Sequence, residues 1–185
     1  MKFQGDQYMQ KITKEVLEKA AKIRLLIFDV DGVLTDGKLF FDEMGREYKA
    51  FHSRDGHGIK MLQKTGVDVA VISGRRSKSV AQRMASLGIE HVFQGQEDKC
   101  AAFNELCTKL GVTADQVAHV GDDLLDLPLM RRAGLAIAVQ DAHFSVRERA
   151  HWITANPGGY GAAREVCDLV MQAQNTFDAA INAYL

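Results

Sequence analysis

Residues 25–37 of the chain read LLIFDVDGVLTDG, and this stretch decides the fold. Its first four residues form an uninterrupted apolar run, which is typical of a strand covered on both faces in a parallel sheet. Asp29 and Asp31 follow two positions apart, so their side chains point to the same side while the backbone stays extended. The stretch therefore predicts a buried strand with a pair of carboxylates at its carboxyl end.

The rest of the chain alternates between short β-rich runs and helical runs, which indicates βαβ units and a parallel sheet of the α/β class. An amphipathic helix through Met9, Ile12, Val16, Ala20 and Ile23 is expected before the first strand, and a hairpin is expected at residues 38–51, around Gly45. Further strands are predicted at residues 67–72, 90–93, 117–120 and 135–139, and helices at residues 57–65, 77–87, 99–110, 125–132 and 162–183.

Polar side chains follow the predicted strands at their carboxyl ends, where open parallel sheets bind ligands. They are Asp29, Asp31, Ser73, Lys99 (after a short loop), Asp122 and Asp123. Carboxylates gathered at one edge repel one another, and a hard divalent cation such as Mg²⁺ relieves that repulsion. One carboxylate can then attack phosphorus while its neighbour serves as acid and base. Any single Asp fits an ordinary solvated turn, but the ordered set does not.

Four of these segments resemble, in order, the four motifs of the haloacid dehalogenase-like (HAD) phosphatases. The motifs are residues 29–37, Ser73, Lys99 and residues 121–126. The resemblance implies a three-layer Rossmann-like HAD core built as one domain over residues 1–185. Only the hairpin and one helix fit between the first two motifs, and one helix and one strand between the next two, so no cap domain is expected.

The HAD resemblance also implies a role for each motif residue. Asp29 would be the nucleophile and Asp31 the acid and base. The side chains of Asp29 and Asp122 and the backbone carbonyl of Asp31 would hold Mg²⁺. Ser73 and Lys99 would bind the phosphoryl group, while Asp123 and Asp126 would orient Lys99 and the waters around the metal.

The predicted hairpin is rich in apolar side chains, namely Leu39, Phe40, Phe41, Tyr48 and Phe51. An exposed apolar hairpin usually marks an interface. We therefore expect a homo-oligomer held together by residues 38–51; the alternative is that the hairpin packs on its own domain. Residues 156–161, NPGGYG, are interpreted as a flexible loop that opens a tail, residues 156–185, ending in the last helix.

A finer resemblance is to the phosphatases that act on 3-deoxy-D-manno-octulosonate 8-phosphate (KDO 8-phosphate), through residues 29–37, 53–56 and 73–75. It implies a capless tetramer of lipopolysaccharide biosynthesis, with a tail that can close over a neighbouring active site. A sugar acid suits arginine, whose guanidinium binds a carboxylate with paired donors. The resemblance implies substrate contacts, partly from the adjacent subunit, by His52, Ser53, Arg54, Asp55, Gly56, Lys60, Arg75 and Arg83, together with Asp31 and Lys99. Lys60 stands where relatives often carry arginine and would bind as a point charge.

Length and composition agree with a single cytoplasmic domain. The chain has 185 residues, of which 46% are hydrophobic and 25% charged, and these are ordinary globular values. A net charge of −1 argues against a nucleic-acid partner. No stretch is long and apolar enough to span a membrane, and the N-terminus is too charged for a signal peptide. Cys100, Cys107 and Cys167 form no CxxC pair and are interpreted as free thiols in a reducing compartment.

Other functions fit part of this pattern. A response-regulator receiver domain shares the sheet, the acids and Mg²⁺, but it is phosphorylated on an Asp at the end of its third strand, and no Asp directly ends the predicted strand 90–93. A non-catalytic HAD protein that binds a sugar acid and a HAD phosphatase for a nine-carbon sialic-acid-type phosphate stay open. So do the choice between dimer and tetramer and the replacement of Mg²⁺ by Mn²⁺ or Co²⁺. His119, inside a predicted strand, is interpreted as a packed core residue.

Overall fold

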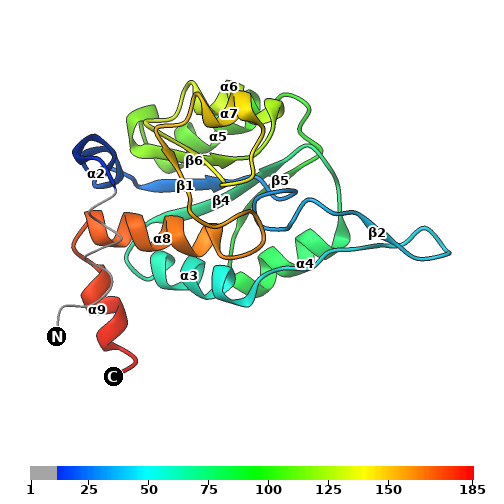
Figure 1. Cartoon of the computed structure of the whole chain (residues 1–185), viewed down its shortest axis with the longest axis horizontal. Helices are drawn as coiled ribbons and strands as arrows, with labels where there is room; N and C mark the ends of the chain where they lie inside the picture. The colour runs from blue at the N-terminus through cyan, green and yellow to red at the C-terminus, as the bar shows by residue number, and fades with distance from the viewer. Residues whose placement is uncertain (1–11) are drawn as a thin grey trace.

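The computed structural model describes residues 12–185, and a six-stranded sheet forms its centre (Figure 1). The strands are β1 (Leu25–Phe28), β4 (Asp68–Ser73), β5 (His91–Gln94), β6 (Val117–Gly121), β7 (Leu135–Ala138) and β8 (Trp152–Ile153). All neighbours are parallel, in the order β5-β4-β1-β6-β7-β8. The strand that leads into the first motif therefore lies inside the sheet, between β4 and β6, as its apolar sequence predicted.

Helices cover both faces of this sheet and give the three layers of the expected α/β core (Figure 1). On one face lie α3 (Ser53–Gln63), α4 (Lys78–Leu87) and α8 (Ala162–Ala173), with α2 (Lys14–Ala20) beside them; on the other lie α5 (Lys99–Leu110) and the short α6 (Leu127–Met130). Alternate residues of β1 serve the two cores. Leu26 and Phe28 belong to the larger cluster, and Leu25 and Ile27 to the smaller.

A two-stranded antiparallel hairpin projects from this core (Figure 1). Its strands are β2 (Phe40–Phe41) and β3 (Glu47–Tyr48), shorter than predicted. Phe40, Phe41 and Tyr48 are about half exposed, with relative residue accessibilities of 48%, 57% and 51%. The prediction of an apolar hairpin in place of a cap domain is confirmed. Phe40, Phe41 and Tyr48 are not buried against their own domain, whereas Phe51 is half-buried and packs against the larger core cluster.

The C-terminal segment differs from the prediction of one helix over residues 162–183, which is wrong. The chain forms α8 and a separate α9 (Phe177–Asn182). Asn175, between them, has a φ of +57°, a left-handed conformation that asparagine tolerates better than most residues. The polar run of Gln174, Asn175 and Thr176 therefore ends α8 where hydrophobic periodicity alone would have continued it.

Other boundaries move by smaller amounts. Helix α3 begins at Ser53, four residues before its predicted start, and the predicted helix 125–132 is a 3₁₀ turn followed by α6. The short α7 (Phe144–Arg147) and the edge strand β8 were not predicted, because both are too short to show a periodic pattern. Met9 of the predicted first helix lies outside the described residues. Within residues 12–185, no helix is long and apolar enough to cross a membrane.

The glycine-rich loop before α8 packs against the first-motif loop of the same chain. The Gly159 amide donates to the carbonyl of Val33 at 2.9 Å, and the Gly158 amide donates to the Asp141 carboxylate at 2.9 Å. A Cβ atom at Gly158 would lie 1.7 Å from the carbonyl oxygen of Gly32, so only glycine allows this approach. The loop thus packs against and stabilises the segment that carries Asp29 and Asp31.

Candidate active site

The side chains predicted to act together do converge at the carboxyl edge of the three central strands. Asp29 directly follows β1, Asp122 directly follows β6, and Ser73 is the last residue of β4. Lys99 is the first residue of α5, where Asp98 caps the helix by accepting from the Cys100 amide. The sheet order β4-β1-β6 therefore brings three of the four motifs together, and the N-terminus of α5 adds the fourth.

Three carboxylates form a cluster at this edge. Asp29, Asp122 and Asp126 each place an oxygen within 4.8 Å of the other two. Burial raises the pKa of Asp29 to about 7, and the negative charge of Asp126 is the second cause. Burial also raises the pKa of Asp122 to about 8, followed by the negative charges of Asp126 and Asp29. One oxygen of Asp29, Oδ1, is buried and has no hydrogen-bond partner within residues 12–185.

This cluster fits a hard divalent cation. Asp29 and Asp122 are half-buried carboxylates that repel each other, and Asp29 has a buried oxygen without a hydrogen-bond partner among the described residues. Carboxylate oxygens are the hard ligands that Mg²⁺ prefers. A Cβ atom at Gly32 would lie 2.0 Å from Oδ2 of Asp122, so the close approach of the two motif loops requires glycine there. Asp29 and Asp122, the two side chains that the sequence predicted as metal ligands, are thus held close together, and Asp126 lies directly beside them.

Asp126 is already saturated with donors, which sets it apart from the other two carboxylates. Its Oδ1 lies 2.7 Å from Lys99 Nζ and 3.0 Å from His119 Nε2, and its Oδ2 accepts from the Asp122 amide at 2.9 Å. Burial would raise its pKa, but the contacts with His119 and Lys99 outweigh burial and hold that pKa below its usual range. Asp126 therefore anchors Lys99, as predicted from the motif, and leaves Asp29 and Asp122 more open to a ligand.

Lys99 lies between the carboxylates of Asp29 and Asp126. Its Nζ is 3.1 Å from Oδ2 of Asp29, and its side chain is only 2% exposed. Burial opposes its charge, but the carboxylates of Asp29 and Asp126 prevail and raise its pKa, so it carries a permanent positive charge beside Asp29. His119 was predicted as a packed core residue; it is fully buried, but it also contacts Asp126, a role that its place in an apolar strand did not indicate.

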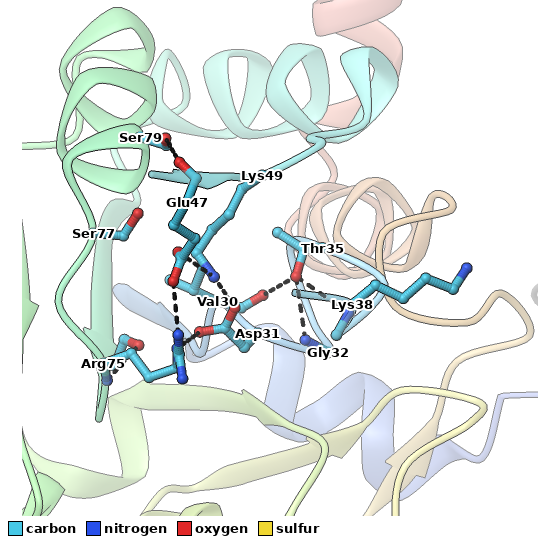
Figure 2. A network of polar contacts seen from close by, with 12 residues as sticks. Val30, Asp31, Gly32, Thr35, Lys38, Glu47, Lys49, Arg75, Ser77 and Ser79 are labelled. Carbon is cyan, nitrogen blue, oxygen red and sulfur yellow. Dashed lines mark hydrogen bonds and ion pairs between the residues drawn. The ribbon is translucent and has the colours of Figure 1, made fainter. Parts of the chain in front are cut away.

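Asp31 points into different surroundings (Figure 2). Its carboxylate contacts the ammonium of Lys49, and its Oδ2 lies 3.8 Å from Nε of Arg75. Glu47 connects the two cations, since its Oε1 is 3.0 Å from Lys49 Nζ and its Oε2 is 2.7 Å from Arg75 Nη2. Burial would raise the pKa of Glu47, but the hydrogen bonds from Arg75 and Lys49 hold it below the usual range.

Glu47 and Lys49 were not among the predicted site residues. The signal that could have found them is their spacing in the hairpin. Residues two apart in a strand share a face, so Glu47 and Lys49 point one way while the exposed Tyr48 between them points the other. A Glu and a Lys on the inner face of an aromatic hairpin indicate that this face meets charged groups.

Thr35 and Ser73 complete the polar framework of the site. The Thr35 hydroxyl accepts from the amides of Gly32 and Gly37 at 3.4 and 3.3 Å and donates to the Val30 carbonyl at 3.3 Å, which shapes the loop after β1 (Figure 2). Ser73 is 3% exposed, and its Oγ accepts from the Arg75 amide at 3.3 Å. Asp123 is exposed and uses its carboxylate to accept from the Leu124 amide at 2.8 Å.

Most of the other predicted substrate residues lie elsewhere. His52, Asp55, Gly56 and Arg83 line a separate small cavity beside Phe51. Asp55 is buried and accepts from the Arg164 amide at 2.8 Å, which ties α3 to the start of α8. Ser53, Arg54 and Lys60 are exposed on α3. Within the described part of the chain, none of these side chains forms a hydrogen bond or ion pair with Asp29, Asp31 or Asp122, whereas Arg75 lies beside Asp31.

The chain is similar to known enzymes along most of its length. Residues 89–165 match the family model described as haloacid dehalogenase-like hydrolase. The chain is 48% identical to the 3-deoxy-D-manno-octulosonate 8-phosphate phosphatase of Yersinia pestis over 91% of this chain and 90% of that protein. The crystal structure of the Yersinia pestis phosphatase matches with a TM-score of 0.89, 48% identity and 90% of each chain covered.

A second crystal structure adds ligands to the comparison. The 3-deoxy-D-manno-octulosonate 8-phosphate phosphatase of Moraxella catarrhalis, in complex with magnesium ion, phosphate ion and KDO, matches with a TM-score of 0.92. Its identity to this chain is 43%, and the match covers 94% of this chain and 99% of the other.

Proposed function

This chain belongs to the haloacid dehalogenase-like hydrolase family, and from that premise we propose that it hydrolyses KDO 8-phosphate to KDO and inorganic phosphate with Mg²⁺, in lipopolysaccharide biosynthesis. The observation that carries the proposal is the carboxylate cluster: Asp29 and Asp122 meet at the edge of the sheet with Lys99 Nζ 3.1 Å from Asp29. The relatives of similar length that bear this substrate in their names support it.

The first half of the reaction transfers the phosphoryl group to the protein. A carboxylate oxygen of Asp29 attacks phosphorus, and the bond from phosphorus to the sugar oxygen breaks. Asp31 gives its proton to the departing oxygen, so the sugar leaves as a neutral alcohol. The product on the enzyme is an aspartyl-phosphate at Asp29.

The second half returns the enzyme to its starting state. Asp31, now ionised, takes a proton from a water molecule as that water attacks phosphorus. The bond from phosphorus to Asp29 breaks, inorganic phosphate is released and the Asp29 carboxylate is restored. Ser73 and Lys99 bind the phosphoryl oxygens in both halves, and the buried charge of Lys99 offsets negative charge where it grows.

The carboxylates of Asp29 and Asp122 and the backbone carbonyl of Asp31 would hold Mg²⁺. When bound, the ion neutralises charge on the transferring phosphoryl group. Asp126 supports this site by holding Lys99 and the Asp122 amide in place, at 2.7 and 2.9 Å. Asp123, at the rim, would orient the waters around the metal.

Recognition of the sugar acid is assigned to Arg75 within the chain and to residues of a second copy. Arg75 is 46% exposed beside Asp31 and presents a guanidinium that suits a carboxylate. The remaining contacts would come partly from the adjacent subunit of a homo-oligomer, by His52, Ser53, Arg54, Asp55, Gly56, Lys60 and Arg83. The exposed Phe40, Phe41 and Tyr48 support hairpin 38–51 as the oligomer contact, with a tetramer as the expected assembly. The glycine-rich loop and α8 pack on their own chain, so of the tail 156–185 only the exposed end at Tyr184 and Leu185 would reach a neighbouring site.

A cytoplasmic location completes the proposal. Cys100, Cys107 and Cys167 are all free, which fits a reducing compartment. It also fits a sugar phosphate substrate made inside the cell.

The test is phosphate release by the purified protein from KDO 8-phosphate and from a nine-carbon sialic acid 9-phosphate. Each substrate is measured with Mg²⁺, with EDTA and with the Asp29→Asn variant. Mg²⁺-dependent release from KDO 8-phosphate that the variant loses is the expected result. A preference for the nine-carbon substrate would retain the mechanism and change the pathway. Release from neither would favour a protein that binds a sugar acid without catalysis.

A further inference from the structure

The hairpin carries a lysine, Lys49, whose side chain is buried although the hairpin around it is exposed. Lys49 lies one residue after β3, next to the half-exposed Tyr48, yet its own side chain is only 1% exposed. Burying an ammonium is costly unless it is paired with acids. Lys49 is paired with two, Asp31 and Glu47, and Glu47 also binds Arg75 (Figure 2). The hairpin therefore reaches into the active site of its own chain.

The contact with Lys49 matters because Asp31 has few other restraints. The Asp31 carboxylate is 20% exposed, and among the described residues its other ionic contact is with Nε of Arg75, at 3.8 Å. Arg75 is itself 46% exposed and makes its shorter contact with Glu47, at 2.7 Å. Lys49 is thus the group that fixes the direction in which the Asp31 carboxyl points.

We propose that Lys49 is a positioning residue for the acid and base Asp31, and that Glu47 holds Lys49 in place. The inference rests on the proposed function, because it assumes that Asp31 gives a proton to the leaving oxygen. Among the described residues Lys49 forms ion pairs with Asp31 and Glu47 and none with Asp29 or Asp122, so it acts through Asp31. Without it, the Asp31 carboxyl rotates among several rotamers and meets the leaving oxygen less often.

The leaving group distinguishes this role from a structural one. An alcohol leaves poorly unless it is protonated, so a sugar phosphate needs a well-placed Asp31. The 4-nitrophenolate anion leaves without a proton, so the first turnover of 4-nitrophenyl phosphate hardly depends on Asp31. A loss of folding, of Mg²⁺ or of the nucleophile would slow both substrates alike.

The experiment measures release of the leaving group in the first turnover, by rapid quench for KDO 8-phosphate and by absorbance for 4-nitrophenyl phosphate. For Lys49→Met we expect the sugar phosphate rate to fall at least ~10-fold, which is part of the ~10²–10⁴-fold that general acid catalysis supplies, and the nitrophenyl rate to fall less than ~3-fold. Lys49→Arg keeps the charge and should recover part of the loss. Glu47→Gln should show the same pattern to a smaller degree.

Lys38→Met is the matched control. Lys38 lies on the same hairpin, but its side chain is 66% exposed and pairs with Asp36. This control should leave both rates unchanged, and sedimentation should show the same assembly for every variant. Equal losses on the two substrates for Lys49→Met, or no loss on either, would overturn the proposal. Wild-type activity reports separately on the proposed function: if KDO 8-phosphate is not cleaved, the comparison is run on a primary alkyl phosphate that is cleaved, and if none is, both proposals fall.

Discussion

Asp29 and Asp31 lie two residues apart, yet two different parts of the molecule surround them. Asp29 lies among Asp122, Asp126 and Lys99, which are carried by a buried strand end, the turn after it and the start of α5. Asp31 lies among Lys49 and Arg75, and the first of these belongs to a short exposed hairpin. The proposed nucleophile is thus positioned by the core of the protein and the proposed acid and base by a peripheral element, so the two functions should respond to different substitutions.

The largest effect is expected at Asp29, in the part of the site that the core positions. Asp29→Asn removes the attacking oxygen, and phosphate release from any phosphomonoester should fall ~10⁴-fold or more, since no other group can form the covalent intermediate. The measurement is steady-state phosphate release, together with trapping of radiolabelled phosphate on the protein. Asp68→Asn, at an exposed position that starts β4, is the control and should stay fully active. Label retained on Asp29→Asn would place the nucleophile elsewhere.

On the hairpin side, Arg75→Ala should affect recognition more than chemistry. Loss of a charged hydrogen bond to the sugar acid costs ~1.5–3 kcal/mol, so KM for KDO 8-phosphate should rise ~10–100-fold. KM for 4-nitrophenyl phosphate, which has no carboxylate, should change little. Arg76→Ala is the matched control, because Arg76 is the exposed neighbour. Similar increases for both substrates would count against a carboxylate contact.

Substitutions of His119 test how strongly this core residue stabilises the cluster of Asp29, Asp122 and Asp126. His119→Phe keeps the size of the side chain but removes the contact with Asp126 Oδ1, now 3.0 Å away, so we expect the free energy of unfolding to fall by ~1–3 kcal/mol. His119→Gln retains a donor and should recover part of that loss. Urea denaturation with and without Mg²⁺ measures both. Wild-type stability in the two variants would mean that the contact does not stabilise the cluster.

A further effect is a pH dependence of the metal-free protein. The pKa of Asp29 is about 7 and that of Asp122 about 8, against an ordinary value of 3.8, so between pH 4 and 8 the folded state binds more protons than the unfolded state. The free energy of unfolding therefore falls as pH rises through that window. Because Mg²⁺ binds the ionised carboxylates, it should raise Tm by more degrees at pH 8 than at pH 6.

Thermal unfolding with Mg²⁺ or EDTA at pH 6, 7 and 8 measures this effect. Asp122→Asn removes one of the two carboxyls with a raised pKa, so its curve should be flatter. A Mg²⁺-induced shift in Tm that is the same at pH 6 and pH 8 would contradict the raised values.

The core side of the site could be predicted from the sequence and the hairpin side could not, for a physical reason. Apolar runs followed by Asp29, Ser73 and Asp122 predict buried parallel strands, and parallel strands bring their carboxyl ends together. The contact of Lys49 with Asp31 depends on the angle at which a two-residue strand leaves the core, and no local pattern encodes that angle. The spacing of Glu47 and Lys49 places them on one face of the hairpin, but it does not show that this face meets Asp31.

His119 and the C-terminal helices show the same limit within the core. An apolar strand predicts that His119 is buried, but not that Asp126 from the following turn reaches back to it. The break at Asn175 depends on a single residue in a left-handed conformation, which interrupts a pattern that is otherwise helical. Burial follows from periodicity, whereas the partner of a buried polar group follows from the tertiary structure.

The position of the glycine-rich loop has a consequence for how the protein comes to be active on the ribosome. Asp29 emerges early in synthesis, but its strand stays unpaired on one edge until residues 117–121 are made, and its loop stays unsupported until Gly158 and Gly159 reach Gly32 and Val33. A nascent chain can thus carry the first three motifs and still expose Leu25–Phe28 as an open apolar edge, the kind of surface that chaperones protect. Activity is therefore a late event in the synthesis of this chain.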